Sequence, residues 1–434
     1  MKSQSIVLSF ALFLVLLVCC GVVQLNGQDS HSAADGDIKV KISPTSISLG
    51  VGANQQFSAT VQGSSNPAVQ WEVNGVVGGN SEVGTIGNSG LYFAPVTVPT
   101  GSVTVTAVAQ EDLSASASAS VNLFPTDPLG TVNRSSIIDC QGGGLQHATC
   151  YSLEVECPGV AGFTTYLKVN NPATGSQGTV IFGIGTGGSG LYENSFTDGT
   201  LTVQTVLDAG FTTAQITFGA PFNTATPNGW LTGPGGVRHL ACRYATAAQW
   251  IYTNIRTAGA PLCATGNSGG SAAITYALAE YGESNILSMV EPTSGPPMAR
   301  LDYGCICTQP AQTTPCGQGQ LSLCYTAQDA ELIDSAYSTP LCSNATSDNS
   351  AQLLSDSVVA PGSSLDYSET FTHIVFGGQD TSPAVPQGLQ WFDGVTSRKG
   401  GPVCVADAPH EIPDVHDGAL RIANDLITNC RLQP

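Results

Sequence analysis

The stretch Cys263–Gly282, CATGNSGGSAAITYALAEYG, decides how the rest of the chain is interpreted. At its centre Ser268 stands between glycines in the pattern G-x-S-x-G. The short apolar run PLCATG before it predicts a buried strand. The alanine-rich segment after it predicts a helix, because its apolar residues recur at helical spacing, namely Ala273, Ile274, Ala277 and Leu278. The stretch therefore predicts a strand, a tight turn with Ser268 at its apex, and a helix.

A reactive serine would explain the glycines of this turn. A serine at the apex of such a turn sits in a strained backbone conformation, and larger neighbours would clash with the strand and the helix. The N-terminus of the following helix points at any negative charge that develops beside the serine, and the Gly269 N–H can donate to it. A glycine-rich turn without chemistry is the alternative interpretation.

The motif also resembles the G-D-S-G-G of chymotrypsin-like proteases. In those enzymes the catalytic His and Asp precede the serine, and the serine motif leads into a strand. Here a helical pattern follows Ser268, so this class of protease is disfavoured.

From about residue 131 to residue 434, strand patterns and helix patterns alternate. Examples are GTVIFGIG at 178–185, LTVQTVLDAG, TAQITFGA, FTHIVFGGQD and the final DGALRIANDLITNC. Such alternation predicts a mostly parallel sheet with helices on both faces. Together with the strand–serine turn–helix unit, these residues resemble the α/β-hydrolase fold family.

The resemblance implies that an acid and a histidine follow Ser268 in that order. Asp380 ends the run HIVFGGQD and would orient the histidine, with Glu291 and Asp302, one strand earlier, as alternatives. His410 lies in the loop between the last strand and the last helix, where the family has its general base and acid. His416, at the start of the last helix pattern, is the alternative histidine.

The family's oxyanion hole takes a second N–H from the loop after an earlier strand. FGIGTGGSG, residues 182–190, is that loop in position and composition, so Gly187 and Gly188 are expected to act with Gly269. A flexible glycine turn is the alternative. A dinucleotide site is disfavoured because no acidic residue ends the next strand. Neither a cofactor nor a metal is implied.

Residues 38–124 contain no cysteine and consist of short alternating runs separated by Gly, Pro and Asn. This pattern predicts an all-β sandwich. ISPTSISLGVGANQQFSATVQG, VQWEVNG and GTIGNSGLYFAP resemble a bacterial immunoglobulin-like domain, in which Trp71 would be the core tryptophan. The resemblance implies a spacer or an adhesive unit that contacts cell-surface or extracellular material. Residues 125–130, PTDPLG, are a linker and a domain boundary.

The first 27 residues have the pattern of an export signal, with Lys2 before a short apolar run, and residues 28–37 are expected to be a linker. The segment LLVCCG also resembles a bacterial lipoprotein signal, with Cys20 as the lipidated residue. Twelve further cysteines, all after residue 130, predict up to six disulfides in an exported chain. Zinc is disfavoured because the paired C-x-x-C spacing is missing.

Five of these cysteines fall in residues 300–365, which are also rich in Pro, Thr and Ser. In this fold an insertion between the serine half and the acid strand often forms a lid over the pocket. A disulfide-pinned lid is therefore expected, with a structural loop cluster as the alternative.

A net charge of −19 makes nucleic acid a poor partner, because the chain repels phosphate backbones. The sequence is best explained as an exported serine hydrolase that cleaves a small-molecule or polymeric carboxylic ester through an acyl-enzyme on Ser268. A peptidase or a thioester hydrolase with the same residues stays open. The alternative from another class is a binding or adhesion protein with an inactive hydrolase-like domain.

Overall fold

The computed structural model describes residues 37–219, 222, 228–397 and 399–432. The expected export signal in residues 1–27, with Cys20, and the expected linker up to residue 36 lie outside the described residues.

Residues 39–124 form a β-rich region with its own core. Its strands are β1 Lys39–Ser43, β2 Ser46–Gly50, β3 Asn54–Gln56, β4 Ser58–Gln62, β5 Val69–Val73, β6 Val76–Val77, β7 Gly79–Asn80, β8 Gly84–Ile86, β9 Leu91–Phe93, β10 Val103–Ala109 and β11 Ser116–Phe124. They form a five-stranded sheet, β2-β11-β10-β5-β6, a four-stranded sheet, β3-β9-β8-β7, and the pair β1-β4.

The alternation of apolar and polar residues explains how these sheets pack. In β10, Val103, Val105 and Ala107 are buried while the threonines between them are half-buried, which is the period of a strand with one covered face. The side chains from the sheets meet in one cluster that contains Trp71, only 6% exposed, together with Phe57 and Tyr92. The expected β-rich N-terminal region is confirmed.

The second region is built on a nine-stranded sheet in the order β12-β13-β14-β16-β15-β17-β18-β21-β22. Its strands are β12 Thr131–Ile138, β13 Thr149–Glu156, β14 Phe163–Asn170, β15 Thr179–Gly183, β16 Thr212–Phe218, β17 Leu262–Asn267, β18 Met289–Thr293, β21 Phe371–Gly377 and β22 Lys399–Val405. From β16 to β22 all neighbours are parallel, whereas β12, β13, β14 and β16 pair antiparallel.

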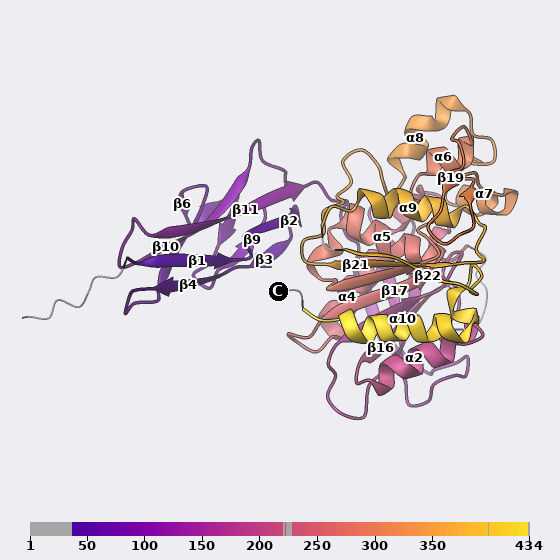
Figure 1. Cartoon of the computed structure of the whole chain (residues 1–434), viewed down its shortest axis with the longest axis horizontal. Coiled ribbons are helices and arrows are strands. Elements are labelled where there is room, and N and C mark those ends of the chain that lie inside the picture. Colours follow the sequence, from indigo (N-terminus) through magenta and orange to yellow (C-terminus); the bar gives the residue numbers. More distant parts are fainter. Residues whose placement is uncertain (1–36, 220–221, 223–227, 398, 433–434) are drawn as a thin grey trace, which may run out of the picture. The chain divides into compact units, whose positions relative to one another are not determined.

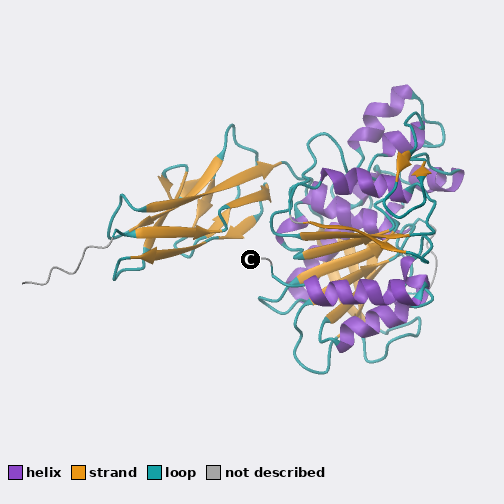
Figure 2. Cartoon of the chain, in the orientation of Figure 1, coloured by secondary structure: helices purple, strands orange, loops and turns teal. Residues whose placement is uncertain are grey.

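Helices cover both faces of this sheet (Figures 1 and 2). They are α1 Tyr192–Ser195, α2 Gly199–Asp208, α3 Val237–Leu240, α4 Cys242–Asn254, α5 Gly269–Tyr281, α6 Leu301–Ile306, α7 Ala327–Asp334, α8 Ser350–Ser355, α9 Ala384–Gly394 and α10 His416–Asn429. In Figure 1, α2 and α10 lie on one face, and α5 and α9 on the other.

Because both faces are covered, the central strands are buried along their whole length, as parallel strands usually are. Successive side chains alternate between two cores. Val180 and Phe182 of β15 join the core beneath α2 and α10, whereas Ile181 joins the core on the α5 face. This arrangement is the expected α/β-hydrolase-like fold, with a mostly parallel sheet between two layers of helices.

The order of the strands determines where a crevice opens. The strand β15 lies between β16 and β17, and the helices that connect these strands, α2 and α4, pack into the two different cores. In open α/β sheets, ligands bind beyond the carboxyl ends of the strands at such a change of direction. The loops after β15 and β17, at residues 184–190 and at Ser268, lie at that point.

Residues 300–365 lie between β18 and β21 and contain α6, α7, α8 and a small sheet of β19 Gln312–Thr313 and β20 Gln320–Leu321. Two disulfides, Cys305–Cys342 and Cys307–Cys324, tie this insertion to itself. A third, Cys316–Cys404, ties it to β22. Whether the insertion moves as a lid stays a prediction.

Three more disulfides, Cys140–Cys150, Cys157–Cys242 and Cys263–Cys430, complete a set of six. The expected disulfide framework is thus present. Disulfides persist in oxidising compartments, so this set is typical of an extracytoplasmic protein. Among the described residues, no helix combines the length and the apolar composition that a membrane span requires.

Candidate active site

Ser268 stands at the junction of β17 and α5 with φ 51° and ψ −116°. A non-glycine residue rarely adopts this left-handed backbone conformation, and it usually does so where the surroundings force it. The atoms that surround the turn are backbone atoms. A Cβ at Gly269 would collide with the carbonyl oxygen of Thr186, and one at Gly266 would lie 2.7 Å from the carbonyl carbon of Gly270. The glycines of the motif therefore have a steric reason.

Backbone hydrogen bonds fix this turn on both sides. The N–H of Ser268 donates to the carbonyl oxygen of Thr293 at 2.9 Å, which ties the turn to β18. The carbonyl oxygen of Ser268 accepts from the N–H of Ala272 at 3.1 Å and also from the hydroxyl of Ser271. The half-buried serine is thus held in place at the N-terminus of a 13-residue helix.

A buried carboxylate and an imidazole meet above the next strands. Asp380 follows the end of β21 and is only 2% exposed, and His410 lies in the loop between β22 and α10. His410 Nδ1 lies 2.9 Å from Asp380 Oδ2. The other oxygen of Asp380 accepts from the N–H of Ser382 at 2.9 Å, and the Ser382 hydroxyl lies 3.1 Å from His410 Nδ1.

These contacts shift the pKa of both groups. Burial alone would lower the pKa of His410, but the hydrogen bond and the charge of Asp380 raise it above its ordinary value. Burial alone would raise the pKa of Asp380, but the hydrogen bond and charge of His410, with the bonds from Ser382, hold it below its ordinary value. The pair is therefore suited to hold a carboxylate beside an imidazole that takes up a proton readily.

The other candidate residues lie elsewhere. Asp302 forms an ion pair with Arg300 at 2.8 Å, and Glu291 is buried against His373 at 2.9 Å. His416 is exposed at the start of α10. Of the three candidate acids, Asp380 is the one that contacts His410. The alternative histidine, His416, lies apart from them on the surface.

Two cavities flank Ser268, and both Ser268 and His410 line each of them. The first has a volume of about 530 Å³ and is also lined by Asp380 and by a largely apolar wall. Residues of that wall are Pro297, Met298, Tyr325, Leu332, Ile333, Pro383 and Ala384. The second has a volume of about 420 Å³ and extends to Ile184, Ser195 and Phe196. Residues of the insertion, among them Asp329 and Leu332, line both cavities, and the sequence led us to expect the insertion beside the pocket.

The loop after β15 approaches the cavities through Thr186. Thr186 lines both cavities and is exposed, with φ 51°. Gly187 and Gly188 are buried behind it, where the Gly188 N–H donates to the carbonyl oxygen of Gly185 at 3.0 Å. The Gly187 carbonyl oxygen accepts from the N–H of Trp230 at 2.8 Å. The tight turn thus brings Gly185 close to Ser268 and the backbone of Thr186 close to Gly269, while Gly187 and Gly188 are buried. Gly269 lines the larger of the two cavities.

Two acidic side chains stand at the rim. Asp329, near the start of α7, and Glu411, next to His410, line both cavities. Both contribute to the raised pKa of His410, after the larger effects of burial and of Asp380. The rim therefore carries a negative potential.

No protein-family model matches this chain, and no curated protein matches it. Similar solved structures include an esterase from Pyrobaculum calidifontis, with 12% identity over 70% of this chain and 86% of that chain and a TM-score of 0.42. A cold-adapted esterase from an Arctic intertidal metagenomic library has 12% identity over 68% of this chain and 100% of that chain, with a TM-score of 0.39. Acetyl xylan esterase 1 from Thermoanaerobacterium has 15% identity over 68% and 88%, with a TM-score of 0.38.

Proposed function

We propose that this protein is an exported serine hydrolase that cleaves carboxylic esters through an acyl-enzyme on Ser268. His410 is the general base and acid, and Asp380 orients its ring and stabilises its cation. The observation that carries the proposal is the 2.9 Å contact between His410 and the buried Asp380, at a cavity that His410 shares with the strained Ser268.

In the first half of the reaction, Ser268 Oγ attacks the ester carbonyl carbon and passes its proton to His410 Nε2. The carbonyl oxygen becomes an oxyanion, for which the N–H groups of Gly269 and Thr186 are the proposed donors. The carbon–oxygen bond to the alcohol then breaks, and the alcohol leaves with the proton from His410. An acyl group remains on Ser268.

In the second half, a water molecule takes the place of the alcohol. His410 removes a proton from the water as it attacks the acyl carbon, and the proton then returns to Ser268 Oγ as the carboxylic acid leaves. The raised pKa of His410 supports its role as proton acceptor, and the lowered pKa of Asp380 keeps the orienting group ionised.

The two cavities that Ser268 and His410 both line offer room for the two halves of an ester. An apolar wall in the larger cavity favours a hydrocarbon-rich group there. The Thr186 N–H is proposed in place of those of Gly187 and Gly188, because Thr186 is the loop residue that lines both cavities.

Export by a signal in residues 1–27 is part of the proposal, with lipidation of Cys20 as a variant of it. Its support is the set of six disulfides, which an oxidising compartment maintains. Residues 38–124 are proposed to be an immunoglobulin-like spacer, because the region has its own core and no motif in it indicates chemistry.

The test is labelling of the purified mature protein with a fluorophosphonate probe, followed by mass spectrometry of the labelled peptide. We expect one label on Ser268 that is lost in Ser268→Ala and in heat-denatured protein, and that is retained in His416→Ala. Hydrolysis of p-nitrophenyl esters should fall with the label, by about 10⁴-fold or more, because the nucleophile and its base act as a unit.

A folded wild-type protein that takes no label, even after the insertion at residues 300–365 has been nicked by a protease, would overturn the proposal. That result would favour the binding or adhesion protein with an inactive hydrolase-like domain.

A further inference from the structure

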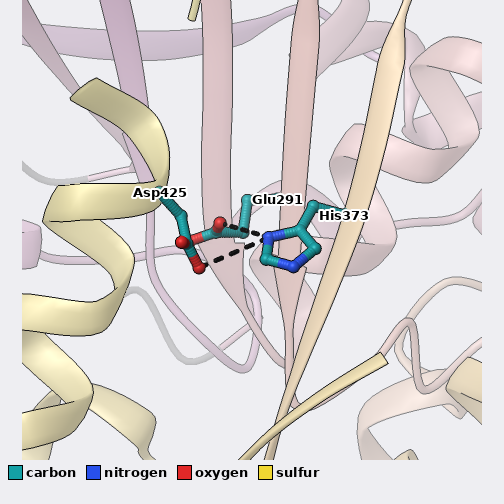
Figure 3. Close-up of side chains that lie close together, drawn as sticks. All are labelled: Glu291, His373 and Asp425. Atoms are coloured by element: carbon teal, nitrogen blue, oxygen red, sulfur yellow. Dashed lines mark hydrogen bonds and ion pairs between the residues drawn. The ribbon is translucent and has the colours of Figure 1, made fainter. Parts of the chain in front are cut away.

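A second group of chemically active side chains lies away from the cavities, between the sheet and α10. Figure 3 shows Glu291 on β18, His373 on β21 and Asp425 on α10 pointing toward one another. The period of a strand explains the first two. Met289 and Val375 are buried in the core beneath α10, so Glu291 and His373, two residues away along their strands, point to the same face.

The spacing of the donor atoms fits a bound cation. His373 Nδ1 lies 2.9 Å from Glu291 Oε2 and 3.4 Å from Asp425 Oδ2, and the donor atoms of all three residues lie within 4.8 Å of one another. Zinc ligands with nitrogen and oxygen lie about 2.0–2.2 Å from the metal. Two such ligands are about 3.0 Å apart at an octahedral edge and about 3.4 Å apart at a tetrahedral edge, by the same bond lengths. Both nitrogen–oxygen distances match these edges.

The second observation is an unsatisfied oxygen. Glu291 is completely buried, and its Oε1 has no hydrogen-bond partner among the described residues. A buried carboxylate oxygen without a partner is costly, and a cation beside it would remove that cost. The group is not sealed, because the side chains of His373 and Asp425 are 7% and 13% exposed. Two of the three side chains therefore keep some contact with solvent.

We propose that Glu291, His373 and Asp425 bind one divalent transition-metal ion of the Zn²⁺ class. One imidazole and two carboxylates suit zinc, whereas calcium and magnesium prefer oxygen ligands alone. Three protein ligands leave at least one coordination position, which water fills. The ion would join β18, β21 and α10, and so would fasten the last helix to the sheet.

Arg421 already binds one of the proposed ligands, Asp425. Its Nε lies 2.5 Å from Asp425 Oδ2, one helical turn away. An ionised carboxylate has about four lone-pair positions, so Asp425 can bind a metal while it accepts from Arg421. Partners of this kind commonly orient the ligands of a metal site. The competing explanation is a metal-free network, in which the Nδ1–H of His373 donates to both carboxylates.

Metal binding to the full-length protein with its disulfides intact distinguishes these two explanations. The protein is treated with a chelator, dialysed, and titrated with Zn²⁺ and separately with Ca²⁺ by calorimetry, and its Tm is measured with and without each ion. We expect one Zn²⁺ per chain, a raised Tm with Zn²⁺, and no comparable effect of Ca²⁺.

The variants Glu291→Gln and His373→Asn should weaken Zn²⁺ binding by about 100-fold or more, because loss of outer-shell partners alone costs about 10- to 100-fold. His416→Asn is the matched control, since it removes an exposed histidine on α10 and should leave the binding unchanged. Equal binding by the His373→Asn variant would overturn the proposal and identify an adventitious surface site.

If both buried variants fail to fold, the wild-type protein and Asp425→Asn still decide the matter. Co²⁺ added to the chelator-treated wild type should give visible d–d absorption bands from a nitrogen–oxygen site. Thiolate charge-transfer bands should be missing, because the twelve cysteines of the described residues are paired. These bands should be lost or shifted in Asp425→Asn. A wild-type protein that shows neither Co²⁺ bands nor stoichiometric Zn²⁺ binding would support the metal-free network and overturn the proposal.

Discussion

The domain holds two pairs of a histidine and a carboxylate with the same 2.9 Å contact, and the two differ in their surroundings. His410 and Asp380 lie beyond the strand ends, beside a cavity and Ser268. His373 and Glu291 lie within the strands, covered by α10. The pKa of Asp380 is lowered by its hydrogen bonds, whereas burial raises the pKa of Glu291 to about 7 despite the contact with His373. Place in the sheet, more than the identity of the groups, determines what each pair is suited to do.

The sharpest test of this contrast replaces each histidine in turn. We expect His410→Ala to lower kcat by about 10⁴-fold or more, because the residue acts in the proposed reaction. The loss of stability should be smaller than for His373→Ala, because the buried Asp380 keeps its hydrogen bonds from Ser382. His373→Ala should instead lower the free energy of unfolding by about 1–3 kcal/mol, because it leaves the buried carboxyl group of Glu291 without its hydrogen-bond partner. Steady-state kinetics and urea unfolding measure the two effects, with the exposed His416→Ala as control.

The contrast would fail if His373→Ala, measured on the folded fraction, lost as much activity as His410→Ala. It would also fail if His410→Ala lowered the stability as strongly as His373→Ala does.

The pH dependence of Asp380→Asn probes the first pair alone. Asp380 raises the pKa of His410, and a general base has to be neutral, so wild-type kcat/KM should fall as the pH drops through a value above 6.5. In the variant this fall should move to lower pH, and kcat should drop by about 10⁴-fold, as when a triad aspartate loses its charge. An acid limb that stays in place would contradict the assignment of Asp380.

Disulfide variants compare how strongly two disulfides stabilise the sheet side and the insertion side of the domain. The cysteines of Cys263–Cys430 are 167 positions apart in sequence, and the bond ends at the C-terminus of α10. Its removal should cost roughly 5 kcal/mol of stability by the loop-entropy estimate. Removal of Cys307–Cys324, whose cysteines are 17 positions apart, should cost roughly 3 kcal/mol. Double Cys→Ala variants compared by urea unfolding test this order, and a larger loss for the shorter loop would contradict it.

The smallest expected effect concerns charge at the cavity rim. A single charge about 4 Å away contributes about 1 kcal/mol in water, so Glu411→Gln should raise kcat/KM for an anionic ester about two- to fivefold relative to a neutral ester. Glu331→Gln, an exposed position on α7, is the matched control. The gain should shrink at high salt, since screening weakens exposed charges. A gain that does not depend on salt would point to a steric effect instead.

The sequence predicted much of the fold, because the relevant signals are local. The alternation in β10 and the apolar runs of β15 and β17 each require only neighbouring residues to be interpreted. The turn at Ser268 was also predictable. Gly266 is required by its close contact with the backbone of Gly270, and Gly269 by its contact with the backbone of Thr186 after the neighbouring strand.

Other features depend on contacts that no short motif encodes. The turn at residues 185–188 exposes Thr186, with φ 51°, to both cavities and buries Gly187 and Gly188, and the glycine-rich sequence of the loop did not show this difference. Glu291, His373 and Asp425 come from three segments that are separated by up to 134 residues in sequence. They therefore do not form a short motif with the spacing of metal ligands. The pairing of the cysteines likewise could not be predicted from the sequence, which indicated only that up to six disulfides form.

The pairing of the cysteines has a consequence for biosynthesis. Only Cys140–Cys150 and Cys157–Cys242 join cysteines that are adjacent in the series. The bond Cys316–Cys404 crosses two others, and Cys263–Cys430 encloses all the remaining ones. A chain oxidised in the order in which its thiols leave the ribosome would first join the wrong partners, Cys263 with Cys305 for example. Production of the native protein therefore depends on thiol–disulfide exchange after synthesis, and its yield should follow the supply of a disulfide isomerase.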